Sequence, residues 1–432
     1  MSAETPSDRY GFDTLAIHAG AAPDPTTGAR STPIYQTTSY VFENVDQAAS
    51  LFNLQSFGNI YTRLTNPTTA VLEERVAALE GGTAALATAS GHAAQLIAFH
   101  LLLSPGDEFI ASNKLYGGSM TQFAHSFSKF GWIVRFVDPD DPENFRRALS
   151  PKTKAIFIES LANPGGVVSD IAAIAAIAHA ADVPLIVDNT LASPYLCRPF
   201  DHGADLIVHS MTKFLGGHGN SVGGILVEGG RFDWAKVAGK YPTICEPTAS
   251  YHGLRFYETF GTMAFAVAAR AISLRDLGPA LSPMNAFLIL TGIETLSLRM
   301  DRHCANALTV ARHLLSHDKV AWVNYAGLPD DRYHQLAARY LPRGAGAVFT
   351  FGVKGGFDAG VKLVEGVELF SHLANIGDTR SLIIHPASTT HRQLPPERRE
   401  AAGAGPDVVR LSVGLESAPD LIADLDQALA GT

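Results

Sequence analysis

From residue 82 to about residue 230 the hydrophobic pattern alternates between short apolar runs and longer amphipathic stretches. The amphipathic stretches predict helices near 92–103, 118–129, 142–149 and 171–181. Strands that alternate with helices in this way predict an α/β fold, a mainly parallel sheet with helices on both faces. The seven strands are expected at 84–89, 107–111, 132–138, 154–160, 184–189, 205–210 and 223–228.

The whole chain divides into four segments. Residues 1–60 are rich in Thr, Pro and Gly, show little helical periodicity and predict an extended arm. Residues 61–250 form the large, sheet-bearing domain, and the long amphipathic patterns of 251–317 predict connecting helices. Residues 318–432 predict a smaller C-terminal α+β domain. Its strands are expected in AVFTFGV, SLIIH and VVRLSVG, and its helices near 361–374 and 418–430.

The composition is that of a well-packed globular protein, with 46% hydrophobic and 17% charged residues among 432. Lys and Arg total 33 against 42 Asp and Glu, and this net charge of −9 argues against nucleic acid or an anionic membrane as partner. Three cysteines without CxxC spacing predict neither a disulfide framework nor a zinc site. Because no signal peptide or spanning helix is evident, we expect a cytoplasmic protein.

In a parallel sheet of this kind, ligands bind at the carboxyl ends of the strands. Ser210-Met211-Thr212-Lys213 ends one predicted strand and precedes a glycine-rich segment. A lysine held there can form a Schiff base with an aldehyde while the hydroxyls bind a phosphate. Asp188 ends another buried run, where a protonated pyridine nitrogen would offset the cost of burying a carboxylate. Taken singly, Lys213 also fits a surface lysine and Asp188 a helix cap.

Two more features lie on neighbouring loops. Ser90-Gly91-His92 connects a strand to a helix, where free backbone N–H groups favour a phosphate, although many such turns look alike. Tyr116 is followed by Gly117-Gly118, and its phenol could stack on an aromatic cofactor or simply pack in the loop. Together the four features place a complete cofactor site at the strand ends of one sheet.

These segments resemble the pyridoxal-phosphate-dependent enzymes of cysteine and methionine metabolism, which have the aspartate aminotransferase fold. The similarity runs from 61 to 414 and is most specific around the lysine. It is carried by YTRLTNPT (61–68), LYGG (115–118), VDNT (187–190), HSMTKFLGGH (209–218) and VRLSVG (409–414). A narrower similarity to the O-acetylhomoserine sulfhydrylase branch lies in FGNIYTR (57–63), CRPFDHGAD (197–205), RDLGPALSPMNAFLILTGIETLSLRM (275–300) and GDTRSLIIHPASTTH (377–391).

The resemblance implies pyridoxal 5'-phosphate (PLP) as the cofactor and assigns its contacts. Lys213 would form the Schiff base and later move protons. Asp188 would pair with the pyridine nitrogen, and Tyr116 would stack on the ring. The phosphate would be held by Gly91, the backbone of His92, Ser210 and Thr212.

The resemblance also implies the substrate contacts and the assembly. Arg410 would bind the α-carboxylate through a bidentate fork that a lysine does not provide, with Ser381 beside it. Asn163 would lie near the cofactor hydroxyl and that carboxylate. Tyr61 and Arg63 would reach the cofactor phosphate of a neighbouring subunit, so an active dimer is expected, and a homotetramer built from two such dimers.

Four positions depart from the family pattern. Gly117 follows Tyr116 where methionine γ-lyases usually carry cysteine, which weakens a lyase interpretation. His92 stands where this branch more often has Gln or Met, and Asn220 where Thr is commoner. Met211 is bulkier than the small residue often found before Thr-Lys. We expect these changes to leave cofactor binding intact and to bear on the preferred thiol or leaving group.

The implied reaction is γ-replacement on O-acetyl-L-homoserine, in which sulfide or a small thiol such as methanethiol displaces acetate and gives homocysteine or methionine. Lys213 and Tyr116 are the expected proton carriers. A methionine γ-lyase and a cystathionine γ-synthase-type enzyme remain alternatives, as does a succinyl leaving group. A Rossmann-type dehydrogenase would need a GxGxxG fingerprint that the chain lacks. A non-catalytic binding protein would be expected to have lost Lys213, Asp188 or Arg410.

Overall fold

The computed structural model describes residues 9–163, 166–390, 392, 397 and 403–432, and its larger sheet has seven strands in the order β1-β7-β6-β5-β4-β2-β3. All pairings among β2 to β6 are parallel, and β7 alone runs opposite, antiparallel to β1 and β6. The predicted mainly parallel sheet is confirmed, each strand within one residue of expectation at either end. The strands are β1 Ala84–Thr88, β2 Glu108–Ser112, β3 Ile133–Val137, β4 Thr153–Glu159, β5 Leu185–Asp188, β6 Leu206–Ser210 and β7 Gly224–Glu228.

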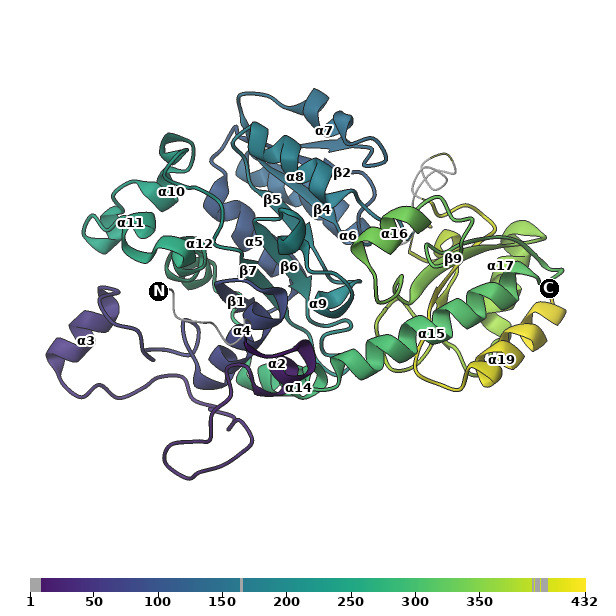
Figure 1. Ribbon diagram of the computed structural model, residues 1–432, viewed down its shortest axis with the longest axis horizontal. Helices are drawn as coiled ribbons and strands as arrows, with labels where there is room; N and C mark the ends of the chain where they lie inside the picture. The colour runs from purple at the N-terminus through teal and green to yellow at the C-terminus, as the bar shows by residue number, and fades with distance from the viewer. Residues whose placement is uncertain (1–8, 164–165, 391, 393–396, 398–402) are drawn as a thin grey trace.

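Each face of this sheet packs on its own helices (Figure 1). Side chains alternate along a strand, so that Val187 and Ile207 belong to one apolar cluster and Ile186 and Leu206 to the other. The first cluster includes α4 (Pro67–Glu80), α8 (Ile171–Ala180) and α14 (Pro283–Ile293). The second includes α5 (Gly91–Leu102) and α12 (Ala264–Ala268). The same alternation determines toward which face of the sheet the side chain of a residue at a strand end points.

A second sheet of five strands, in the order β10-β11-β12-β9-β8, lies at the other end of the molecule (Figure 1). Its strands are β8 Val320–Asn324, β9 Val348–Val353, β10 Ser371–His372, β11 Leu382–Ile384 and β12 Val408–Ser412. The long helix α15 (Leu296–Leu315) runs toward it from the larger sheet (Figure 1). Its other helices are α16 His334–Tyr340, α17 Gly356–Gly366 and α19 Ala418–Ala430. The domain boundaries themselves stay a prediction.

The N-terminal segment is less extended than expected. It contains α2 (Phe12–His18) and α3 (Val45–Phe52), and α3 lies at the edge of the molecule in Figure 1. The two helices have only seven and eight residues, too few to give a sustained helical pattern in a segment rich in Thr, Pro and Gly. Val41, Val45 and Phe57 are exposed around α3. Among the described residues no helix is long and apolar enough to cross a bilayer.

Two predicted helices also need correction. The helix expected at 118–129 is a short α6 (Gly117–Thr121) that widens into a π-helix over Gln122–Ser126 and then tightens into a 3-10 turn over Phe127–Phe130. This path brings Phe123 and Phe127 onto Phe99. The helix expected at 361–374 is α17, which ends at Gly366 because the next backbone N–H groups, from 368 to 370, bind the Asp424 carboxylate. The remaining α-helices are α7 Glu143–Ala148, α9 Ser193–Leu196, α10 Pro242–Cys245, α11 Phe256–Phe260 and α13 Arg275–Leu277.

Candidate active site

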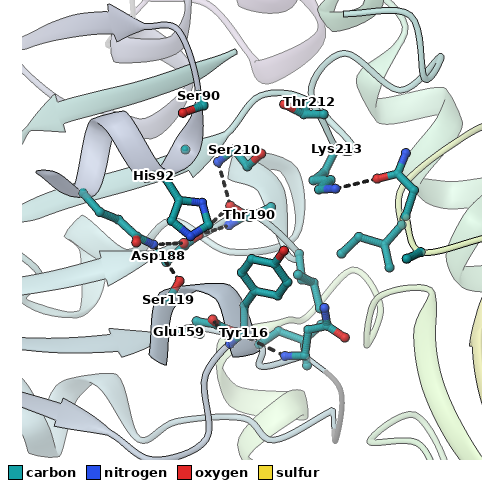
Figure 2. Close-up of a pocket in the computed structure, with 18 of the residues that line it drawn as sticks. Ser90, His92, Tyr116, Ser119, Glu159, Asp188, Thr190, Ser210, Thr212 and Lys213 are labelled. Atoms are coloured by element: carbon teal, nitrogen blue, oxygen red, sulfur yellow. Dashed lines mark hydrogen bonds between the residues drawn. The ribbon is translucent and has the colours of Figure 1, made fainter. Parts of the chain in front are cut away.

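A cavity of about 220 Å³ lies at the carboxyl ends of β4, β5 and β6 and is bounded on its other side by Arg410 of β12 and by residues 374–376 of the loop before β11 (Figure 2). Most residues expected at the site line it. They are Gly91, His92, Tyr116, Asn163, Asp188, Ser210, Thr212, Lys213 and Arg410. Side chains far apart in the sequence therefore face one space, as the strand-end rule predicts.

Lys213 follows β6 and points into the cavity. Its Nζ donates a hydrogen bond to Asn375 Oδ1 at 2.5 Å. Burial, with the charge of Arg410 as a smaller cause, lowers the pKa of Lys213 to about 8. The neutral amine is the form that attacks an aldehyde carbon, so this environment suits Schiff-base formation.

Asp188 ends β5 beneath the same space. Its Oδ1 accepts hydrogen bonds from the Thr190 backbone N–H (3.0 Å) and hydroxyl (2.5 Å), and its Oδ2 accepts one from Gln95 Nε2 at 3.3 Å (Figure 2). Burial raises the pKa of Asp188, and the hydrogen bond from Thr190 opposes the shift. No lysine or arginine of the described chain forms an ion pair with this carboxylate. A protonated pyridine nitrogen would supply the missing cation.

Glu159 is a second buried carboxylate that sequence reasoning missed. It pairs in register with Asp188 on the adjacent strand. Its Oε1 accepts the Tyr116 N–H at 2.6 Å, and its Oε2 accepts the Asn163 N–H at 3.1 Å (Figure 2). Burial, and then the charge of Asp188, raise the pKa of Glu159 well above its ordinary value. The sequence did contain a signal for Glu159, because it is a charged residue at the end of the apolar run of the predicted strand 154–160.

The expected phosphate cradle lies where the start of α5 meets the end of β6. A Cβ on Gly91 would lie 2.8 Å from Ser210 Cβ, so only glycine permits this approach. The Ser90 hydroxyl caps α5 by accepting from the Ala93 N–H, and Thr212 Oγ1 accepts from the Gly223 N–H at 3.1 Å. A helix N-terminus beside the hydroxyls of Ser210 and Thr212 favours binding of a phosphate. The residues present therefore fit the anionic end of PLP.

Arg410 projects from β12 on the opposite wall. Its Nη1 donates to Asn163 Oδ1 at 3.1 Å, and its Nη2 donates to the Asn375 carbonyl at 3.3 Å. Burial lowers the pKa of Arg410 to about 10, and no carboxylate of the described chain forms an ion pair with it. A partly buried guanidinium without a counterion, facing a cavity, suits the carboxylate of an amino acid.

The half-exposed Tyr116 ring stands beside the cavity, with its centroid 5.9 Å from that of His92. Three other residues expected at the site lie outside the cavity of the single chain. The Ser381 hydroxyl donates to Glu416 Oε2 at 2.9 Å and accepts from the Gly414 N–H, so its contact with substrate stays a prediction. Tyr61 is exposed, and the Arg63 guanidinium lies 5.6 Å from its ring, so their reach into a neighbouring subunit also stays a prediction.

Asn375, Thr190 and Gln95 also face the cavity but were missed from the sequence. Thr190 was within reach, because it belongs to the quoted VDNT segment and binds Asp188 two residues earlier. Gln95 lies one helical turn after Gly91 on α5. It is therefore not at the carboxyl end of a strand, where ligand-binding residues were sought. Asn375 comes from the loop before β11 and enters the site only because the two sheets pack together.

A nucleophilic amine, an unpaired acid and an anion cradle at the strand ends of this fold define a PLP-dependent enzyme. The chain belongs to the Cys/Met metabolism PLP-dependent enzyme family, whose sequence model matches residues 13–430. It is 53% identical to the O-acetyl-L-homoserine sulfhydrylase of Leptospira meyeri, covering 99% of this chain and 98% of that protein. It is 51% identical to O-acetyl-L-homoserine sulfhydrylase 1 of Thermus thermophilus, covering 97% and 100%. It is 48% identical to the homocysteine synthase of Schizosaccharomyces pombe, covering 98% and 99%.

A solved structure shares the fold over nearly the whole chain. The crystal structure of a Campylobacter jejuni protein described as an O-acetylhomoserine (thiol)-lyase superposes with a TM-score of 0.93 at 43% identity, covering 98% of this chain and 100% of that one. That protein carries N'-pyridoxyl-lysine-5'-monophosphate. The predicted fold class and cofactor are thereby confirmed, and the roles of individual residues stay predictions.

Proposed function

We propose that this chain is a PLP-dependent O-acetyl-L-homoserine sulfhydrylase that exchanges the γ-acetoxy group for sulfide or a small thiol. In the reaction with sulfide, the Cγ–O bond breaks, a Cγ–S bond forms, and homocysteine and acetic acid result. The observation that carries this choice is the similarity, over nearly the full length, to bacterial proteins named for this activity. The cavity supports it with an amine and a guanidinium on opposite walls.

PLP, when bound, withdraws electrons from the substrate and so makes its α- and β-protons acidic. The protein's own groups do the rest. Arg410 holds the α-carboxylate, with Asn163 fixing the guanidinium. Lys213, whose pKa is lowered to about 8, takes up and returns protons near neutral pH. Tyr116, fixed through its backbone by Glu159, covers the cofactor ring.

Asp188 holds the proton on the pyridine nitrogen, and Gly91, His92, Ser210 and Thr212 hold the phosphate. Two such chains form an active dimer through Tyr61 and Arg63, and two dimers form a homotetramer. The enzyme serves methionine biosynthesis in the cytoplasm. The similarity of residues 57–63 to the sulfhydrylase branch, together with the exposed apolar side chains around α3, supports the dimer.

The test is to incubate the holoenzyme with O-acetyl-L-homoserine, with and without sulfide, and to measure homocysteine, 2-oxobutyrate and ammonia together. Homocysteine that forms only with sulfide supports the sulfhydrylase. Oxoacid and ammonia in both tubes would instead indicate a γ-lyase, and cystathionine formed only when cysteine is added would indicate a synthase. Replacing acetyl with succinyl in the substrate separates the two leaving groups.

A further inference from the structure

A buried polar network lies behind the cofactor site, on the other face of the large sheet. Glu80, the last residue of α4, is fully buried, and its Oε1 accepts hydrogen bonds from His209 Nε2 at 2.5 Å and from Asn189 Nδ2 at 2.9 Å. Asn189 Oδ1 in turn accepts the Ser160 hydroxyl at 2.7 Å. One carboxylate thus ties together residues from the ends of three adjacent strands.

Each of these strand residues adjoins a residue of the site. Ser160 follows Glu159, Asn189 follows Asp188, and His209 precedes Ser210. Because side chains alternate along a strand, a network on the α4 face puts each neighbour on the cavity face. The apolar clusters agree, since Val187 and Ile207 pack with α4 while Ile186 and Leu206 pack with α5.

We propose that Glu80 is a positioning residue for the cofactor. By holding Asn189 and His209 together from behind, it sets the spacing between Asp188 on β5 and the Ser210–Lys213 turn after β6. This inference rests on the roles proposed above for Asp188 and Ser210, which would bind the two ends of the same cofactor molecule.

Stabilisation of the fold does not by itself explain this polar network. Glu80 Oε2 and His209 Nδ1 are buried and have no hydrogen-bond partner in the described chain, and unpartnered buried polar atoms cost free energy. Hydrogen bonds to a buried carboxylate are directional, however, and they fix geometry more narrowly than apolar packing does. The two faces are also linked electrostatically, because burial raises the pKa of Asp188 while the hydrogen bond from Thr190 and the Coulombic effect of His209 oppose that rise.

The same sheet contains a matched control. Asp205 is buried at the amino ends of β5 and β6, where it accepts hydrogen bonds from the Leu185 N–H at 2.8 Å and His179 Nε2 at 2.9 Å. Asp205 thus resembles Glu80 in being a buried carboxylate that binds a histidine and a residue of β5, here with His179 of α8 as the histidine, but it lies at the end of the sheet away from the cavity. Its loss should cost stability and leave the cofactor site alone.

The experiment compares Glu80→Gln, Glu80→Ala and Asp205→Asn as holoenzymes. Glu80→Gln keeps the shape and one acceptor oxygen, and it guards against an alanine variant that does not fold. We measure the visible circular dichroism of the bound cofactor, the melting temperature, and the dissociation constant of PLP by dialysis against known PLP concentrations. We expect Kd to rise about threefold in Glu80→Gln and about tenfold in Glu80→Ala, as loss of a charged hydrogen bond implies. The cofactor dichroism should change with it.

Asp205→Asn should lower the melting temperature while its Kd stays within about twofold of wild type. The inference is overturned if both Glu80 variants keep the wild-type Kd and dichroism, or if Asp205→Asn changes them equally. These readouts do not depend on the substrate. A wild-type holoenzyme that makes no homocysteine would therefore refute the proposed reaction without deciding the role of Glu80.

Discussion

Replacing Arg410 with lysine tests how the site binds an amino acid. A guanidinium has five N–H donors, and Arg410 donates one to Asn163 Oδ1 and one to the Asn375 carbonyl. Three donors remain for a carboxylate. An ammonium has three in total, so a lysine that kept both asparagine contacts would have one left. The variant therefore loses at least one charge-assisted hydrogen bond to the substrate, although its charge is retained.

Such a bond contributes about 1.5–3 kcal/mol, which corresponds to a rise of roughly 10- to 150-fold in KM for O-acetyl-L-homoserine. Because the α-carboxylate is not a reacting group, kcat should fall by less than about tenfold. The assay is steady-state homocysteine formation at saturating sulfide, with the visible spectrum of the cofactor recorded for each variant. That spectrum should not change, because no cofactor contact is assigned to Arg410.

Arg380→Lys is the matched control. Arg380 is exposed and pairs with Asp378 at 3.3 Å, a surface ion pair whose loss should change KM by less than about twofold. The reasoning is refuted if Arg410→Lys keeps KM within about threefold of wild type while kcat collapses. An equal rise in KM for both variants would also refute it, because the effect would then not depend on the buried fork.

Three further predictions follow from the same contacts. Lys213→Ala should lower activity by about 10³-fold or more and abolish the borohydride-reducible link to the cofactor, and a link that persists would reject Lys213 as the Schiff-base lysine. Gly91→Ala should raise the Kd for PLP by about tenfold, because its Cβ would meet Ser210, whereas Gly239→Ala, whose Cβ meets nothing within 4 Å, should not. Burial lowers the pKa of His303 to about 4, so the unfolded chain binds this proton first as the pH falls. The free energy of unfolding should drop by up to about 3 kcal/mol from pH 6.5 to 4, and His303→Gln should flatten that drop in urea titrations; parallel curves for the two proteins would contradict it.

The large sheet was predictable because each of its strands is a compact apolar run with turn residues at both ends. The smaller sheet was harder. β8 is a short apolar run, Val320–Asn324, that was not recognised as a strand, and β10 has only two residues, too few to give a pattern of its own. The end of α17 depends on Asp424, which lies in the sequence almost 60 residues beyond it. Contacts of that kind leave no local pattern, so the end of this helix was placed too late.

The site residues likewise divide into those that a local sequence pattern predicts and those that depend on contacts between distant parts of the chain. Lys213 and Asp188 were found because a charged residue at the end of a buried run is conspicuous. Glu159 occupies an equivalent place on β4 and could have been found by the same rule. Asn375 is different, because nothing in its own segment indicates that it meets Lys213, and it does so only through the packing of one sheet against the other.

The residues proposed for cofactor binding and for carboxylate binding lie on different sheets, and this separation has a consequence for how the enzyme can evolve. The groups proposed for the cofactor, Asp188, Ser210 and Lys213, lie on or just after strands of the larger sheet, and Arg410, the residue proposed to bind the carboxylate, lies on a strand of the smaller one. Substitutions around Arg410 can thus alter how the carboxylate end of a substrate is held while the groups proposed for the cofactor stay unchanged. Selection on carboxylate binding can then act on the smaller sheet with the cofactor-binding groups intact, whereas selection on the thiol or leaving group would act on positions of the larger domain such as His92, Met211 and Asn220.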